Sequence, residues 1–294
     1  IWGYIINNLW LLTEERPKEE VISLIIDYFS KEKKIKIIES KISIKPIIDI
    51  NDRFTFIYEI LGFESKDIKN FYIKIVSGYS SFVDYLVFFQ KEEPNNFDIP
   101  ILAIEETKTS DNQSRNTGVY QRATKFIYID YFFKNVKKIM LYNFQIEAKT
   151  KQSQTSIFGT KCFSTIGVDI IGKTKETPFG SVEELIKSKN SMKLRVKTNI
   201  PIRISKFDDK IEISGRLIKN DSLAHDPNIG ALSLIAKSLR TLGWKKGIVI
   251  TKHGLEQKHI KNSKFIQICE LLSISIEGLD INNFAKKTSY WRYE

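Results

Sequence analysis

A chain of 294 residues, 42% of them hydrophobic, is long enough to bury a sizeable core and too apolar to be intrinsically disordered. Its 46 basic and 35 acidic side chains give a formal charge of +11, which favours a polyanionic partner, nucleic acid before an anionic membrane. The two cysteines, Cys162 and Cys269, lie far apart, which excludes a disulfide scaffold and predicts a reducing, intracellular (cytoplasmic) setting.

The first segments along the chain are an apolar stretch and a predicted helix. The stretch, IWGYIINNLWLL, is interrupted by two asparagines and has no basic leader, so we expect neither a signal peptide nor a membrane span. Residues 17–33 predict an amphipathic helix, opened by Pro17, with acids in its first turn and bases in its last. The acids Glu19 and Glu20 are interpreted as first-turn helix charges. The apolar stripe of this helix consists of Val21, Leu24, Ile25 and Tyr28.

The middle of the first half is predicted to be rich in strands. Residues 35–63 are ambiguous, and the segment IYEILGF is compatible with a short helix that ends at Gly62. The last of the strands that follow is apolar at consecutive positions, so both its faces are expected to be buried in a sheet covered by helices. The predicted strands are residues 71–76, 81–89 and 100–108.

A helix over residues 117–135 and a strand over residues 137–144 are expected next. In the helix, Val119, Ala123 and Phe126 lie on one side. Over residues 17–144 the predicted order is therefore helix, three strands, helix, strand.

The second half, after a soft boundary near residue 148, mixes strands and helices. SIFGTKCFSTIGVDIIG predicts a hairpin, and IPIRISKFDDKIEISGRLI predicts another around its Asp-Asp-Lys turn. HDPNIGALSLIAKSLRTLG predicts a helix with Asp226 as its N-cap and Gly243 at its end, so His225-Asp226 is interpreted as capping rather than as a general base or metal ligand. A strand in KKGIVITKHG, a helix in QKHIKNSKFIQICELL and a strand in SISIEGL complete the chain.

The residues best suited to chemistry gather at the end of the third predicted strand. Alternate side chains of a strand share a face, so Glu106 and Lys108 point one way and Glu105 and Thr107 the other. A carboxylate that ends an apolar strand is costly unless it is paired, hydrated or bound to metal. Asp84 on the neighbouring strand can approach Glu106, and these two carboxylates with the Thr107 carbonyl suit Mg²⁺. If the register is shifted by one residue, Glu105 takes the place of Glu106.

Such a site would suit phosphodiester hydrolysis. A bound Mg²⁺ polarises the phosphate and lowers the pKa of an attacking water, and Lys108 can offset the negative charge that develops. The alternative is a solvated strand end with a surface ion pair, the usual state of charged side chains.

This arrangement resembles the PD-(D/E)xK nucleases, whose shared core is αβββαβ with Asp on the second strand and (D/E)-x-K on the third. Asp84 takes the Asp position, and Glu106 with Lys108 supplies E-x-K, whereas Val83 stands where the family often has Pro. The resemblance implies an α/β fold with a mixed sheet, a restriction-endonuclease-like αβββαβ core, and additional β-hairpins and helices in the C-terminal half.

The resemblance also suggests further site residues. The helix after the catalytic strand often carries a polar residue that faces the site, and Gln121 corresponds to it, with Lys125 one turn further on. Both are otherwise interpreted as a solvated helix face. Arg115 could contact phosphate, because a guanidinium fork suits that geometry. Glu19 or Glu20 could contribute to a metal site, as in some members of the family. Candidates for reading bases in the second half are Lys149, Lys151, Gln152, Arg203 and Arg216.

Charge and resemblance together predict a type II restriction endonuclease that makes Mg²⁺-dependent double-strand cuts in DNA at a short specific site. We expect a homodimer whose two-fold axis matches a palindromic target, with residues 1–148 as the catalytic core and residues 149–294 for recognition and dimerisation, or one continuous domain. No G-x-x-x-x-G-K loop is present, so no nucleotide cofactor is expected. No membrane partner is expected either. The alternatives are a repair or recombination nuclease of the same fold with low specificity, and a non-catalytic DNA-binding module.

Overall fold

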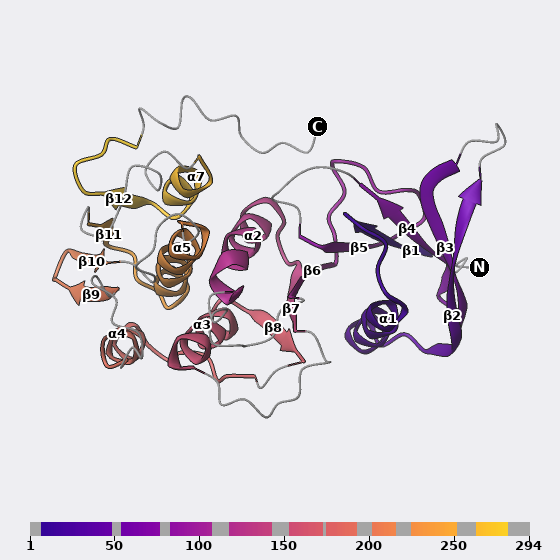
Figure 1. Cartoon of the computed structure of the whole chain (residues 1–294), viewed down its shortest axis with the longest axis horizontal. Helices are drawn as coiled ribbons and strands as arrows, with labels where there is room; N and C mark the ends of the chain where they lie inside the picture. The colour runs from indigo at the N-terminus through magenta and orange to yellow at the C-terminus, as the bar shows by residue number, and fades with distance from the viewer. Residues whose placement is uncertain are drawn as a thin grey trace, which may run out of the picture. The chain divides into compact units, whose positions relative to one another are not determined.

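The computed structural model describes residues 7–48, 54–76, 83–107, 118–142, 153–172, 175–192, 202–215, 225–251 and 263–281. Within these ranges the fold is mixed α/β, with six helices, a sheet of eight strands and a sheet of four (Figure 1), which confirms the predicted class. The chain divides into two compact units. The first comprises Ile1–Glu105 and Phe133–Lys137, and the second comprises Glu106–Phe132 and Lys138–Tyr293. The boundary expected near residue 148 falls outside the described residues.

The larger sheet is mixed, with its strands hydrogen-bonded in the order β2-β3-β4-β1-β5-β6-β7-β8. Their bounds are β1 Asn7–Thr13, β2 Ile37–Ile48, β3 Phe54–Ser65, β4 Ile68–Ile75, β5 Tyr85–Gln90, β6 Leu102–Thr107, β7 Lys137–Tyr142 and β8 Val168–Ile171. The strand expected over residues 137–144 is therefore confirmed as β7.

Strand β1 is the main departure from the expected order in the first unit. It runs parallel to β4 and antiparallel to β5, and its Leu9 and Leu11 are fully buried. The N-terminal apolar stretch thus contributes a core strand, which was not predicted from the sequence. The three predicted strands exist as β4, β5 and β6, but β1 lies between the first and the second, so the expected consecutive αβββαβ arrangement of strands is interrupted.

The ambiguous segment before β4 is an antiparallel pair, β2 with β3, rather than a helix. Gly62 lies within β3 at a φ of +92°, and a Cβ atom at this position would lie 2.1 Å from the main-chain oxygen of Lys41. The pairing register shifts nearby, between Glu39 and Ser43. Gly62 therefore allows a local irregularity in the strand pairing. The short helix ending at Gly62, which the sequence was compatible with, does not form.

Helix α1, Glu19–Lys33, forms where it was expected, but its buried side differs. Leu24 and Tyr28 of the predicted stripe are half-buried. Phe29 is fully buried and meets Phe89 of β5 edge to face, with 5.2 Å between ring centres. The apolar face therefore lies slightly to one side of the predicted stripe, and its members are Val21, Ile22, Ile25, Ile26 and Phe29.

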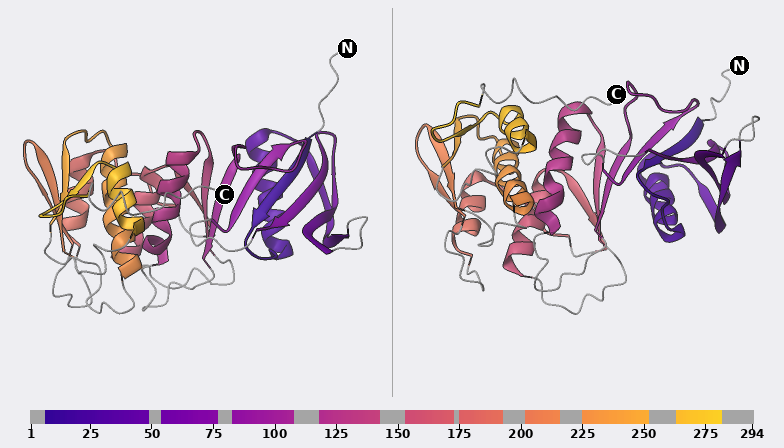
Figure 2. Two further views of the ribbon diagram at one scale, coloured as in Figure 1. Left: turned by 90° about the horizontal axis from the view of Figure 1, so that it is seen from above. Right: turned by 45° about the horizontal axis from the view of Figure 1, so that its top comes forward.

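The second unit contains five helices and the four-stranded sheet among its described residues. Strands β10, β11 and β12 are parallel, joined by α5 and α7, and β9 pairs antiparallel with β10, which confirms the hairpin predicted there. Figure 2 shows α5 and α7 beside this sheet. The bounds are α2 Gly118–Phe132, α3 Gln154–Thr165, α4 Val182–Asn190, β9 Arg203–Lys206, β10 Lys210–Ser214, α5 His225–Thr241, β11 Gly247–Ile250, α7 Ser263–Leu271 and β12 Ile274–Ile276.

The hairpin predicted for SIFGTKCFSTIGVDIIG was wrong. Most of this segment is helix α3, and β8 follows it parallel to β7. The Ser153 hydroxyl caps the helix by accepting a hydrogen bond from the Ser156 main-chain N–H at 3.1 Å. Phe158 and Cys162, four residues apart, are buried on one side. A cap and a helical spacing of apolar residues were thus present in the sequence.

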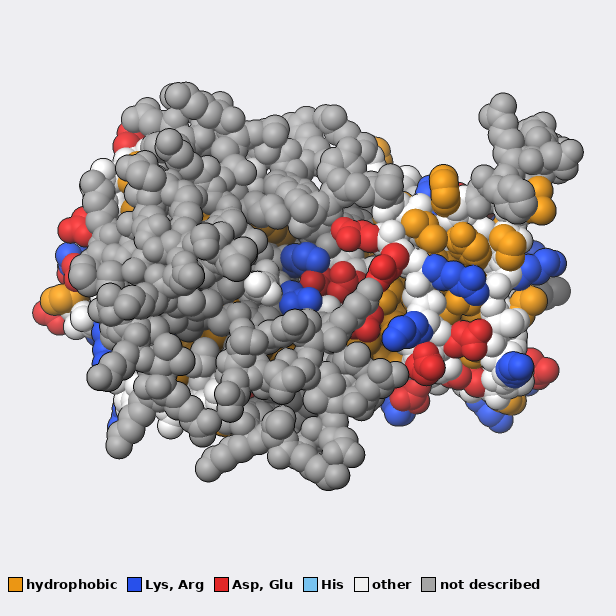
Figure 3. Space-filling view, in the orientation of Figure 1, with side chains coloured by type: hydrophobic (Ala, Val, Ile, Leu, Met, Phe, Trp, Pro, Cys, Tyr) orange, Lys and Arg blue, Asp and Glu red, His pale blue; other side chains and the backbone are white. Residues whose placement is uncertain are grey.

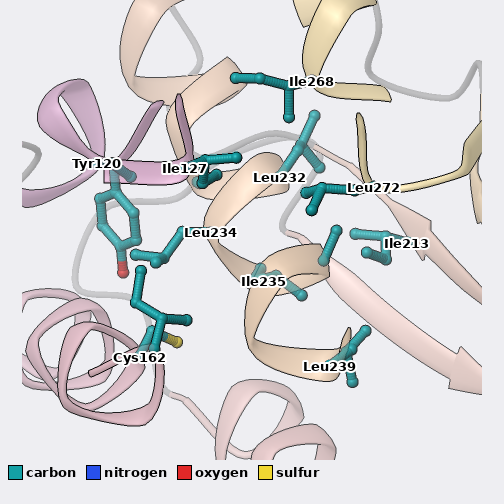
Figure 4. Packing of buried hydrophobic residues seen from close by; sticks show 14 of the residues in the cluster. Tyr120, Ile127, Cys162, Ile213, Leu232, Leu234, Ile235, Leu239, Ile268 and Leu272 are labelled. Carbon is teal, nitrogen blue, oxygen red and sulfur yellow. The ribbon is translucent and has the colours of Figure 1, made fainter. Parts of the chain in front are cut away.

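Helix α5 forms the centre of the second unit's core. It begins at His225, so Asp226 lies inside the helix rather than at its cap position, and its side chain lies outside the described set. Gly243 ends it as predicted, at a φ of +90°, with the Trp244 main-chain N–H donating to the Leu239 carbonyl at 3.0 Å. Figure 4 shows α5 residues packed with those of neighbouring elements, including Tyr120 of α2.

Candidate functional site

Asp84 lies immediately before β5 rather than within it, and its side chain is half-buried. The antiparallel register pairs Tyr85 with Ile104, which joins the beginning of β5 to the end of β6. One position further along both strands come Asp84 and Glu105. In keeping with this register, the Asp84 main-chain N–H donates a hydrogen bond to Glu105 Oε2 at 3.2 Å.

Glu105 is therefore the carboxylate that the structure brings to Asp84. Its side chain is 2% exposed, whereas Glu106 is half-buried. Residues directly opposite each other in an antiparallel pair share a face, and neighbouring residues of one strand alternate between faces. The geometry thus favours the shifted register, in which Glu105 takes the place first given to Glu106.

The strand end itself carries the other predicted residues. β6 ends at Thr107, whose main chain is described and whose side chain is not, and Lys108 follows outside the described residues. The E-x-K spacing links Lys108 to Glu106, whereas Glu105 precedes Lys108 by three residues.

Helix α2 contributes Arg122 to the end of this strand. Arg122 Nε donates to the Glu106 main-chain oxygen at 3.1 Å, and its side chain is half-buried. Gln121, the residue predicted to face the site, is exposed, and Lys125 is half-buried. Arg122 was not predicted from the sequence, although it lies three residues after buried Val119, beside the buried side of the helix.

Of the residues predicted to contact DNA, the structure describes Arg203 and Lys125. Arg203 is exposed on β9, and its Nη1 donates to the Asn190 main-chain oxygen at the end of α4. The Asn190 side chain also bonds both main-chain groups of Ile204, at 2.7 and 3.0 Å, so Arg203 belongs to a tie between α4 and β9. Outside the described residues lie Arg115, Lys149, Lys151, Gln152 and Arg216.

The donor set at Asp84 fits a hard cation in chemistry, though not as a cage of protein ligands. Among the described residues no group of three or more His, Cys, Asp and Glu side chains could hold a metal ion. The Glu105 carboxylate accepts the Asp84 main-chain N–H, so two acidic residues are neighbours at this strand end. Mg²⁺ is often bound by one or two carboxylates, with water and phosphate oxygens as its remaining ligands. Glu19 and Glu20 are exposed in the first turn of α1, as their interpretation as helix charges requires.

A second cluster of charges, within the second unit, is structural. Asp130 of α2 accepts a hydrogen bond from Lys138 of β7, and its Oδ2 lies 2.9 Å from Lys237 Nζ of α5. Lys138 also donates to the Ile166 carbonyl at 2.9 Å. Burial lowers the pKa of Lys138, and the Asp130 carboxylate opposes that shift. Lys138 is buried while Asp130 and Lys237 are half-buried, and the mutually bonded set connects α2, β7 and α5.

The cysteines offer no reactive thiol. Cys162 and Cys269 are both fully buried, and burial raises the pKa of each thiol, to about 12 for Cys162. A thiol at such a pKa stays protonated and is a poor nucleophile. On the face shown in Figure 3, basic and acidic side chains of the described residues are interspersed rather than gathered into a field of one sign.

The chain was compared with protein-family models, curated proteins and solved structures. No protein-family model, no curated protein and no solved structure matches the chain. In the part of the chain that the structure describes, none of the helices is both long enough and apolar enough to cross a membrane.

Proposed function

We propose that this protein is a Mg²⁺-dependent nuclease that cuts double-stranded DNA by phosphodiester hydrolysis, at a short specific site in the manner of type II restriction endonucleases. The observation that carries the proposal is the hydrogen bond that the Asp84 main-chain N–H donates to the carboxylate of the buried Glu105. It places two acidic residues together where β5 begins and β6 ends, immediately before Glu106 and Lys108 in the chain. The surplus of basic side chains supports a polyanionic substrate.

In this proposal hydrolysis needs a bound metal ion, an attacking water and a group that offsets negative charge. A water oxygen forms a bond to phosphorus, and the bond to the leaving oxygen breaks as that oxygen takes up a proton. Asp84 and Glu105, with the Thr107 carbonyl, would bind Mg²⁺, which when present lowers the pKa of the attacking water. Lys108 would orient that water and offset the negative charge that develops on the phosphate.

A homodimer suits the proposed substrate. A two-fold axis in the protein that matches a palindromic DNA site brings one active site to each strand. The residues proposed to read the site, which mix basic with amide or hydroxyl groups, lie in the second half of the chain, from Lys149 to Gln154 and from Arg203 to Arg216.

The test is digestion of phage genomic DNA by the purified protein with Mg²⁺, beside EDTA and beside the variants Asp84→Asn and Lys108→Ala. Exposed Lys33 of α1, mutated to Ala, serves as a matched control for loss of one positive charge. Discrete bands from the native protein and the control, lost with EDTA and in both site variants, are the expected result.

Other outcomes separate the alternatives. A smear lost in the same controls would keep the nuclease and remove the site specificity, as in a repair or recombination enzyme. DNA binding without cleavage under varied metals would favour a non-catalytic DNA-binding module. In that case the bond from Asp84 to Glu105 would be a structural tie at a strand end.

A further inference from the structure

Arg122 of α2 holds the main chain at the end of β6. Its Nε donates to the Glu106 carbonyl at 3.1 Å across sixteen positions of sequence, and its side chain is half-buried. β6 pairs with β5 from Leu102 to Ile104, and β7 is its hydrogen-bonded neighbour on the other edge. The guanidinium adds a side-chain bond from α2 at the end of the strand, two residues beyond that pairing with β5.

The bonded carbonyl belongs to the peptide group that links Glu106 to Thr107. Because a peptide group is planar, holding its oxygen fixes the plane and restricts the rotations on either side. Glu105 precedes this peptide by one residue, and Lys108 follows it by one. One hydrogen bond therefore restrains the chain directly after Glu105, the acid that accepts the Asp84 main-chain N–H.

An arginine suits this task better than the other polar residues of α2. Its guanidinium stays protonated at any working pH, and a charge-assisted hydrogen bond to a carbonyl is stronger than a neutral one. Its planar fork of donors also holds a direction, which the ammonium of a lysine does not.

We propose that Arg122 is a positioning residue of the nuclease site, which acts by holding the Glu106 carbonyl and so aligning the end of β6. The inference rests on the proposed function, since it names a residue that serves the same site. Misplacement of catalytic groups by about 1 Å can cost roughly 100-fold in rate. Loss of Arg122 is therefore expected to lower the rate of cleavage by about 10- to 100-fold while DNA binding changes little.

The experiment compares Arg122→Ala and Arg122→Lys with the native protein and with Lys134→Ala, an exposed cation just beyond α2. Single-turnover cleavage is measured with Mg²⁺, and DNA affinity is measured with Ca²⁺. Methylguanidinium is then added to Arg122→Ala. The expected result is slow cleavage, DNA affinity close to native, partial rescue by methylguanidinium and no effect of Lys134→Ala. A general loss of structure would lower DNA affinity and melting temperature together and would not respond to methylguanidinium.

A second measurement separates this inference from the proposed function. Mn²⁺ affinity of the protein without DNA is determined by electron paramagnetic resonance for the native protein and Arg122→Ala. The inference predicts weaker Mn²⁺ binding in the variant. If the native protein binds Mn²⁺ but does not cleave, the proposed function fails while the change in affinity still decides the role of Arg122. Equal Mn²⁺ affinities, or native cleavage rates in Arg122→Ala, would overturn the inference.

Discussion

At the scale of single residues, the choice between two neighbouring glutamates decides how the proposed site is built. Glu105 is buried and accepts a hydrogen bond from the Asp84 main chain, whereas Glu106 is half-buried and offers its main-chain oxygen to Arg122. A buried carboxylate is kept ionised by hydrogen bonds or by a cation. The geometry therefore favours Glu105 ahead of Glu106 for the ligand role.

We predict that Glu105→Gln lowers Mg²⁺-dependent cleavage far more than Glu106→Gln does. Glutamine keeps the shape and a hydrogen-bond acceptor but removes the negative charge that binds the cation, so a loss of about 100-fold or more is expected. The measurement is the single-turnover rate of both variants over a range of Mg²⁺ concentrations. A larger loss in Glu106→Gln would restore the unshifted register, in which Glu106 and Lys108 share a face.

A second residue-scale prediction concerns the pH dependence of stability. Lys189 of α4 is 4% exposed, with its ammonium 5.8 Å from the centre of the Phe158 ring. Burial, together with the nearby charge of Arg203, lowers the pKa of Lys189 from its ordinary 10.5 to about 8. Between these two values the unfolded chain binds more protons than the folded one, so the free energy of unfolding rises with pH. The cost of burying the charge is fully present below pH 8.

Replacing this lysine should therefore stabilise the protein at neutral pH. Lys189→Met is expected to raise the free energy of unfolding by up to about 3 kcal/mol at pH 7, and the gain should shrink as the pH approaches 10.5. Urea unfolding of the native protein and the variant at a series of pH values measures the difference. Exposed Lys187 on the same helix, mutated to Met, is the control. A gain independent of pH would contradict burial of the ammonium charge as its cause.

At the scale of elements, the packing of α2 against α5 depends on one glycine. A Cβ atom at Gly230 would lie 1.7 Å from the main-chain oxygen of Tyr120, a distance that no flexible side chain can relieve. Tyr120 is fully buried and donates its hydroxyl to the Thr155 carbonyl at 2.7 Å. The close approach of the two helices therefore fixes α2, and with it Arg122.

We predict that Gly230→Ala forces these helices apart and lowers the free energy of unfolding by about 3 kcal/mol or more, since overpacking against main chain cannot relax locally. Gly180→Ala is the matched control, because a Cβ there meets just the end of the Glu184 side chain, at 3.4 Å. Chemical denaturation of both variants gives the comparison. Similar stabilities for the two would mean that the helices move apart without cost.

The elements also show what the sequence can and cannot predict. Helices α1, α2 and α5 and the pair β9–β10 followed from periodicity and turn residues, because these signals are local. Strand β1 did not, since its place between β4 and β5 depends on partners distant in the chain. Helix α3 was mistaken for a hairpin because its glycine and β-branched residues favour strands and turns, and its Ser153 N-cap was not predicted.

The candidate site, like the fold, could be predicted from the sequence in part. Asp84 and the acids at the end of β6 could be named from the sequence, because acidic residues at the end of an apolar run can be recognised there. The sequence could not show which glutamate lies beside Asp84, because a shift of one residue in register exchanges the two faces of the strand. Arg122 could not be chosen over Gln121 either, since the difference lies in the rotation of α2 relative to the strand end.

At the scale of the whole molecule, the charge of +11 is the property that bears on the substrate. On the face shown in Figure 3 the described charges are of both signs, so attraction to DNA has to come from particular residues rather than from a uniform surface. Each cation that neutralises a phosphate releases counterions, and the logarithm of the binding constant then falls linearly with the logarithm of salt concentration. The slope therefore counts phosphate contacts.

We predict that DNA affinity falls about 1,000-fold or more between 50 and 200 mM salt, as expected for roughly six or more phosphate contacts. Lys125→Ala, on α2 one turn after Gln121, should reduce the magnitude of the slope by about one if Lys125 contacts a phosphate. Lys134→Ala, which removes the same charge from an exposed position, should leave the slope unchanged. Fluorescence anisotropy with labelled duplex DNA, in Ca²⁺ to prevent cleavage, measures both. Equal slopes for the two variants would show that Lys125 contributes net charge alone, and a flat dependence on salt would remove DNA as the partner that the charge favours.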